Sequence, residues 1–194
     1  LIKTVQYDTI SHEHMRYYSL TSLSYLFKKY NLKIFYAKKI QTHGGSIRVY
    51  VSKNKNQKVH SSVKKILQYE KKFLNEKTFE SFKEKVIKSK INLYALLKGL
   101  KNKKKIIYGV GAPSRAATLV NYVGLNEDII NCILEIKGSY KIGKYMPGTN
   151  IPIINENIMN KKKPDYLLIL SWHIADFLIK NFKKKGYRGK FIIP

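Results

Sequence analysis

A cluster of ionisable side chains near the start of the sequence has the composition of a proton-transfer site. Ser11 begins a block that continues as His12, Glu13 and His14, so two imidazoles flank one carboxylate. An imidazole titrates near neutral pH, and a neighbouring carboxylate can orient or polarise it. The block therefore predicts a general base, although a polar surface turn would have the same composition. A metal site that includes His43 is not predicted, because no cysteine or second carboxylate lies at ligand spacing.

A first glycine-containing turn is a candidate for contact with a ligand. Paired glycines before a β-branched run usually form a tight turn, and they also let a ligand approach the backbone closely. The turn therefore has a structural and a binding interpretation. Its candidate binding residues are His43, Gly44, Gly45 and Ser46.

A second glycine-containing turn joins a buried apolar run to a predicted helix. Such a turn exposes backbone N–H groups and the positive helix end, which suit a phosphate. The third glycine of the dinucleotide signature is absent, so the turn alone is a weak signal. Glu135 ends the next apolar run, where it is either a ribose acceptor or a surface carboxylate. The candidate binding residues of the turn are Gly109, Gly111, Ala112, Pro113, Ser114 and Arg115.

The elements before residue 103 are a hairpin and several helices. A Ser/Thr start and apolar spacing predict a helix at 19–27. Two β-rich runs, 32–37 and 46–51, flank the first glycine turn and predict a hairpin that closes a sheet. Apolar residues at helical spacing predict a very basic helical stretch at 61–100. We interpret this stretch as an amphipathic connector, with a helix at a membrane surface as the alternative.

From residue 103 the pattern alternates between apolar runs and helices. Near-continuous apolar strands between helices are typical of a parallel sheet covered on both faces. The fold class is therefore α/β, with a small Rossmann-like domain at 103–194. The predicted strands are 105–110, 129–135, 165–170 and 190–193, and the predicted helices are 115–123 and 174–185.

The composition excludes several classes of protein. The net charge is +26, but only four of the 38 basic residues are arginine, the side chain best suited to phosphate and base contacts. Lys, Ile and Asn share A/T-rich codons, so genome composition explains the charge and no nucleic-acid partner is predicted. No apolar run is long enough to cross a membrane, and the N-terminal residues do not read as a signal peptide. The single cysteine, Cys132, excludes an internal disulfide, and the expected compartment is the cytoplasm.

Several blocks, in one consistent order, resemble the sugar C-methyltransferases that act on nucleotide-linked 4-keto-deoxysugars. Independent blocks in the right order are more specific than any single motif. The resemblance spans nearly the whole chain except the lysine-rich 53–102. Its blocks are 7–14, 17–23, 42–50, 108–122, 144–153 and 164–172.

The resemblance implies a three-part enzyme of which this chain is the C-terminal part. The family has an N-terminal domain that binds zinc through cysteines and a middle domain that binds S-adenosylmethionine. Its C-terminal Rossmann-like domain completes the site for a nucleotide-linked sugar. Residues 1–56 are then the end of the methyltransferase domain, 57–102 the helical connector, and 103–194 the Rossmann-like domain. The zinc and S-adenosylmethionine sites are expected upstream, in a portion supplied in cis or in trans.

The resemblance also assigns roles within the histidine block. His14 is expected to be the base, with Glu13 and His12 as its catalytic neighbours. Ser11 stands where the family typically has a tyrosine, and serine is too short to present a phenol. The alternative to an enzyme is a stand-alone module that holds a nucleotide sugar without catalysis.

Overall fold

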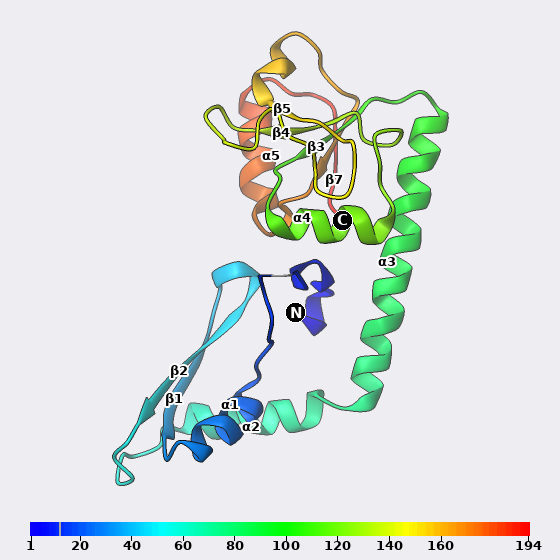
Figure 1. The fold of residues 1–194 in the computed structure, drawn as a ribbon. Helices are drawn as coiled ribbons and strands as arrows, with labels where there is room; N and C mark the ends of the chain where they lie inside the picture. The colour runs from blue at the N-terminus through cyan, green and yellow to red at the C-terminus, as the bar shows by residue number, and fades with distance from the viewer. Residues whose placement is uncertain (12) are drawn as a thin grey trace. The chain divides into compact units, whose positions relative to one another are not determined.

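The chain folds as two compact units, seen in the computed structural model of Figure 1. The structure describes residues 1–11 and 13–194, and of the described residues the side chains of 43 and 160 are left out. The N-terminal unit comprises Leu1–Val5 and Glu13–Glu84, and the C-terminal unit comprises Gln6–His12 and Lys85–Pro194. The short segment Gln6–His12 is therefore part of the C-terminal unit, although nearly the whole N-terminal unit follows it in sequence.

The C-terminal unit is built on a five-stranded sheet in which every pair of neighbours is parallel. The strand order is β5-β4-β3-β6-β7. The chain builds outward from β3 on one side, then crosses to β6 on the other side, as in Rossmann-like folds. This confirms the predicted fold class. The strands are β3 (Ile107–Val110), β4 (Cys132–Glu135), β5 (Ile153–Asn155), β6 (Tyr166–Ile169) and β7 (Lys190–Ile192).

Both faces of this sheet are buried, which explains why its strands are almost continuously apolar. Tyr108 and Leu167 pack with Phe182 of helix α5 (Ala175–Lys184) in one core cluster. The residues that alternate with them, such as Ile107 and Leu168, point to the other face and are fully buried too. Helix α4 (Ser114–Val123) follows β3 and buries four side chains, namely Ala116, Leu119, Val120 and Val123.

The N-terminal unit is smaller and is organised around a hairpin. Strands β1 (Lys33–Ile40) and β2 (Ser46–Ser52) pair antiparallel, which confirms the predicted hairpin. Helix α1 (Leu20–Lys29) begins at the predicted place, where Ser19 and Ser22 form a capping box. The described core of this unit consists of Leu20, Ile34, Ala37 and Val63, with partly buried neighbours.

The segment expected to be one connector, 57–102, is divided between the two units. Helix α2 (Ser61–Phe73) inserts Val63 into the core of the N-terminal unit, so it is part of that unit. Helix α3 (Glu76–Asn102) contains the boundary between Glu84 and Lys85. The predicted boundaries at 56 and 102 therefore differ from those of the structure, because the apolar face of α2 has a partner within the unit.

Short 3₁₀ helices complete the fold, and one of them belongs to the site described below. Helix η2 (Tyr7–Thr9) lies against α4. The others are η1 (Ile2–Thr4), η3 (Thr42–Gly44), η4 (Glu156–Asn160) and η5 (Trp172–Ile174).

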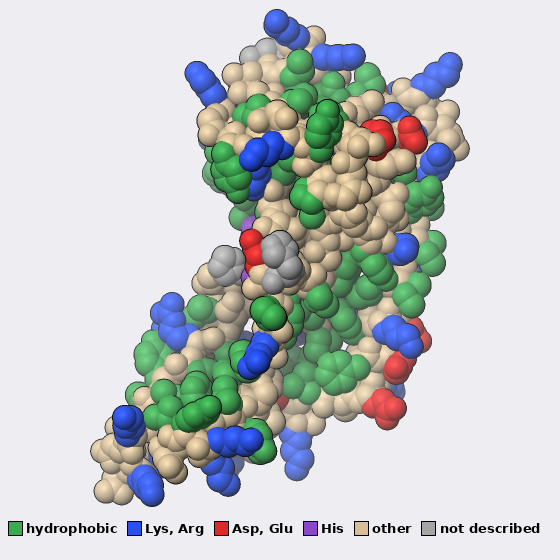
Figure 2. Space-filling view, in the orientation of Figure 1, with side chains coloured by type: hydrophobic (Ala, Val, Ile, Leu, Met, Phe, Trp, Pro, Cys, Tyr) green, Lys and Arg blue, Asp and Glu red, His purple; other side chains and the backbone are tan. Residues whose placement is uncertain are grey.

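On one face of the molecule, the strong positive charge is not gathered in one place (Figure 2). On the face shown in Figure 2, Lys and Arg side chains are scattered over each unit and are interrupted by apolar and acidic side chains. Within the described part of the chain, no helix is long and apolar enough to cross a membrane.

Candidate functional site

The turn between β3 and α4 is shaped by two glycines that have no room for a side chain. A Cβ on Gly109 would lie 2.9 Å from Cγ1 of Ile133 on the neighbouring strand. Gly111 has a φ of +80°, and its Cβ would collide with Oγ of Ser171 after β6. The glycines thus let the ends of β3, β4 and β6 approach closely, as the structural interpretation of the motif requires.

Groups from β4 and from the segment after it bind the backbone of this turn. The N–H of Gly111 donates to the carbonyl of Leu134 (2.9 Å), and that of Ala112 donates to Oε1 of Glu135 (2.7 Å). Nζ of Lys141 donates to the carbonyl of Ala112 at 2.7 Å. Glu135 therefore has a structural function, and its predicted contact with a ribose stays a prediction.

The crevice of a Rossmann-like sheet lies at the carboxyl ends of β3 and β6, where the chain reverses its direction of winding. Arg115 follows β3 and Trp172 follows β6, and both bind Asp8. Nε and Nη2 of Arg115 donate to Oδ2 and Oδ1 of Asp8 at 2.7 and 2.8 Å. Nε1 of Trp172 donates to Oδ2 at 2.8 Å. The side chain of Asp8 is only 3% exposed and that of Arg115 12%.

This cluster has the geometry of a strong buried ion pair. A bidentate arginine–carboxylate pair combines charge with two aligned hydrogen bonds. The guanidinium of Arg115 also lies 4.7 Å from the ring centre of Trp172, within the range of a cation–π contact. Arg115 was predicted to meet phosphates, but two of its nitrogens already donate to Asp8. Its phosphate contact stays a prediction with a weaker physical basis.

The residues around Asp8 attach the rest of its segment to α4. Tyr7 is 7% exposed, and its ring centre lies 5.1 Å from that of Tyr122. Burial raises the pKa of the Tyr7 hydroxyl. Oγ1 of Thr118 donates to the carbonyl of Ile10 at 3.2 Å. We call the five residues from Gln6 to Ile10 the anchor segment. The sequence gives no local signal of these contacts, and the prediction missed Asp8 and Trp172.

The histidine block begins directly after the anchor segment and crosses the division between the units. Ser11 is partly buried and belongs to the C-terminal unit. Glu13 and His14 are exposed and belong to the N-terminal unit, where the ring of His14 meets that of Tyr17 edge-on at 6.3 Å. His12 lies outside the described residues. The catalytic roles of the block stay predictions.

The first glycine turn connects the two strands of the hairpin. Gly44 and Gly45 have φ angles of 80° and 115°, which favour glycine. The N–H of Gly45 and Oγ of Ser46 both donate to the carbonyl of Thr42, at 3.1 and 2.9 Å. These bonds confirm a tight turn. The ligand contacts predicted for Gly44, Gly45 and Ser46 stay predictions, and the side chain of His43 is outside the described part.

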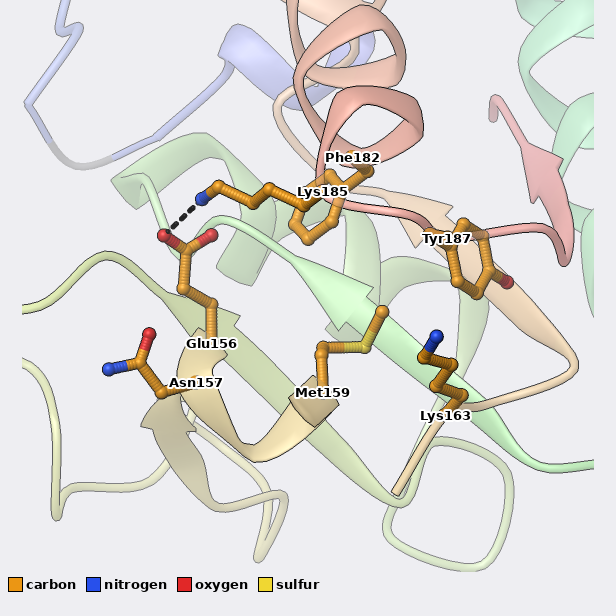
Figure 3. A pocket seen from close by; sticks show the side chains of 7 residues that line it. All are labelled: Glu156, Asn157, Met159, Lys163, Phe182, Lys185 and Tyr187. Atoms are coloured by element: carbon orange, nitrogen blue, oxygen red, sulfur yellow. Dashed lines mark hydrogen bonds and ion pairs between the residues drawn. The ribbon is translucent and has the colours of Figure 1, made fainter. Parts of the chain in front are cut away.

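A cavity of about 260 Å³ lies elsewhere in the C-terminal unit and contains none of the predicted residues (Figure 3). Met159 and Phe182 form part of its wall, and an ion pair between Glu156 and Lys185 (2.8 Å) lies at its side. Burial raises the pKa of the Tyr187 hydroxyl, which donates to the carbonyl of Lys190. Glu156 and Lys185 therefore bind one another, and Tyr187 binds a backbone carbonyl. Nothing in the described lining of the cavity points to a reaction.

The fold and the glycine turn define a Rossmann-like α/β domain with a Gly-x-Gly turn at the carboxyl edge of its sheet. The family model for the C-methyltransferase C-terminal domain matches residues 41–194, and the chain belongs to this family. It is similar to the C-methyltransferase NovU of Streptomyces niveus, with 32% identity over 200 residues. The match covers 100% of this chain and 47% of that relative, so the chain spans about half of the relative's length.

Proposed function

We propose that this chain is the sugar-binding and proton-abstracting part of a C-methyltransferase that depends on S-adenosylmethionine. Its substrate would be a nucleotide-linked 4-keto-deoxysugar, methylated at a carbon next to the ketone. The family membership supports the transferase class. One observation carries the proposal: the histidine block directly follows the anchor segment, and the C-terminal unit binds that segment. Ser11 directly follows the anchor segment, whose Asp8 is held by Arg115 and Trp172.

The chemistry requires a base because methylation at carbon needs a carbanion. A proton on a carbon next to a ketone is acidic, since the electron pair left behind delocalises onto the ketone oxygen. His14 would accept this proton on a ring nitrogen, and the C–H electron pair would form the enolate. Glu13 would hold the imidazolium in place, because an adjacent carboxylate stabilises the charged ring.

The nucleotide end of the substrate would be recognised by the edge of the sheet. Helix α4 begins after Pro113 with no side-chain cap, so the positive end of the helix faces outward at Ser114. The high positive charge of the chain would add a general attraction for a diphosphate. His43, Gly44, Gly45 and Ser46 are proposed to contact the sugar.

S-adenosylmethionine does not fit the turn after β3. The N–H groups of Gly111 and Ala112, which the cofactor would need, donate to Leu134 and Glu135. We therefore place the methyl-donor site in the part of the enzyme that this chain does not include, together with the family's zinc site. The residues of this chain would bind the substrate and remove its proton.

The base assignment is tested by His14→Asn in the full-length enzyme. The substitution keeps a polar side chain but removes its basicity, so methyl transfer should fall about 10²–10⁴-fold. Exchange of the substrate's α-proton with heavy water, followed by NMR, should fall in parallel, because exchange needs only the base. His12→Asn is the matched control and should cause a smaller loss. If His12→Asn abolishes exchange and His14→Asn does not, the base is His12, and if neither variant changes exchange, the block is structural.

The second candidate function is a module that binds a nucleotide sugar without catalysis. The observation that favours it is the turn after β3, whose Gly111 and Ala112 N–H groups already donate to Leu134 and Glu135, so that this turn offers no site for a methyl donor. The two functions separate in one assay on the full-length protein with S-adenosylmethionine and the sugar. Sugar binding without methyl transfer would support the module and reject the enzyme.

A further inference from the structure

Ligands of such sheets usually bind at the carboxyl ends of the strands where the winding reverses, here β3 and β6. In this chain the residues that follow these strands, Arg115 and Trp172, bind the protein's own Asp8. Asp8 accepts three hydrogen bonds from two side chains that follow these strands. Its charge is balanced by Arg115, and the pair is nearly shielded from water. These contacts fix the anchor segment at the carboxyl ends of β3 and β6.

The anchor segment is short and is bound along most of its length. Tyr7 packs on Tyr122, Asp8 is held by the ion pair, and Ile10 accepts a hydrogen bond from Thr118. A fully extended chain spans about 3.3–3.6 Å per residue. His14 is four residues after Ile10, so the chain can separate the predicted base from the bound anchor segment by at most about 14 Å. A base whose position must be accurate needs a fixed point close by.

We propose that Asp8 is a positioning residue for the base: through Arg115 and Trp172 it fixes the start of the histidine block on the C-terminal domain. The domain then contributes to catalysis by holding the base as well as by binding the substrate. This proposal depends on the proposed function of His14. A purely structural ion pair would stabilise the fold without any specific effect on proton transfer.

The test is a double-mutant cycle in the full-length enzyme, with α-proton exchange in heavy water as the readout. Asp8→Asn keeps the shape of the side chain but removes its charge. At saturating sugar nucleotide, exchange should slow about 10–100-fold, the effect expected of a misplaced catalytic group, while KM changes less than about 3-fold. In the His14→Asn background, Asp8→Asn should slow the remaining exchange by less than about 2-fold, because residues that act as a unit are non-additive.

Asp165→Asn is the matched control for Asp8→Asn. Asp165 also pairs with a basic side chain, Lys105, at 3.1 Å, but it precedes β6 and so lies at the amino edge of the sheet. Its loss should leave exchange unchanged. If Asp8→Asn does not fold, Trp172→Phe replaces it. This change keeps an aromatic ring and removes one donor to Asp8, and exchange should slow about 3–10-fold in the same cycle.

The outcomes separate the two proposals. If His14→Asn abolishes exchange but the effect of Asp8→Asn is equal in both backgrounds, the positioning proposal is wrong and the base assignment holds. No effect of Asp8→Asn on exchange in the otherwise wild-type enzyme would lead to the same conclusion. If His14→Asn leaves exchange intact, the base assignment is wrong and the positioning proposal is rejected with it.

Discussion

The two units of the chain differ in how far their β-sheets are buried. In the C-terminal unit, β3, β4 and β6 are covered on both faces, and Ile107, Ile133 and Leu168 have no exposed surface. In the N-terminal unit the sheet has two strands, and four buried hydrophobic residues form its described core cluster. Tyr25 and Tyr30 in and after α1 remain 68% and 69% exposed. The apolar core can stabilise the C-terminal unit by itself, whereas an isolated two-stranded sheet is marginal.

The N-terminal unit compensates for its small core with a buried polar contact. Glu70 of α2 is 8% exposed and binds the start of α1. Its Oε1 accepts from the N–H of Leu20 (2.8 Å), and its Oε2 accepts from the N–H (2.7 Å) and Oγ1 (2.6 Å) of Thr21. A carboxylate at a helix N-terminus satisfies unpaired N–H groups and complements the helix dipole. We therefore expect the stability of the C-terminal unit to depend on apolar packing and that of the N-terminal unit to depend on Glu70 as well.

The largest expected effect comes from the same truncation in each core. Leu20→Ala and Leu168→Ala each remove a fully buried side chain, at a cost of about 2–5 kcal/mol of unfolding free energy. Leu168→Ala should leave the C-terminal unit folded but less stable, and Leu20→Ala should unfold the smaller unit. Amide hydrogen exchange measured by mass spectrometry reports each unit separately. Equal loss of protection in both units, from either change, would contradict the comparison.

A smaller effect is expected from Glu70→Gln. The amide that replaces the carboxylate keeps the shape but loses the charge and one acceptor, so the N-terminal unit should lose about 1–3 kcal/mol. Glu80→Gln is the control, because Glu80 forms an exposed pair with Lys83 at 3.4 Å and should cost at most about 0.5 kcal/mol. Hydrogen exchange in α1 is the measurement. Equal effects of the two changes would show that Glu70 has no special function.

The smallest effect concerns the pH dependence of the C-terminal unit. The N–H of Ile106 and the ammonium of Lys105 lower the pKa of Asp165. A lowered pKa stabilises the fold above the unfolded-state pKa of about 3.9, and this contribution is lost as the pH falls through the folded-state pKa. Asp165→Asn should therefore make the unit less sensitive to acid. The fluorescence of Trp172, the single tryptophan, reports acid unfolding. Identical acid-unfolding curves for wild type and variant would contradict this prediction.

The sequence predicts the sheet of the C-terminal unit well because its strands are buried on both faces. The predicted runs 105–110, 129–135 and 165–170 contain β3, β4 and β6 with errors of at most three residues at each end. The edge strand β5 was missed, because three residues are too few to give a pattern. The break between α2 and α3 was also missed. Asn75 gave a signal there, since its Oδ1 accepts from the N–H of Thr78 as a helix cap does.

The candidate site was predicted less well because its residues are far apart in the sequence. The glycines at 109 and 111 are recognisable from sequence because the Gly-x-Gly pattern between an apolar run and a helix lies within a few residues. The partner of Arg115 is 107 residues away, and no periodicity connects the two positions. A helix-initial arginine after a glycine turn looks like a phosphate ligand. Only the fold shows that a carboxylate of the same chain binds it.

The pairing of Asp8 with Trp172 also determines when the protein can finish folding. The two residues are separated by 164 positions. At a synthesis rate of about 5–20 residues per second, Asp8 is synthesised roughly 8–33 s before Trp172. During this time the contacts of Asp8 are incomplete, and the C-terminal unit can close only late in translation. The same separation affects truncation: a fragment that starts at residue 103 would contain every strand of the sheet and would leave the buried Arg115 without its counter-ion.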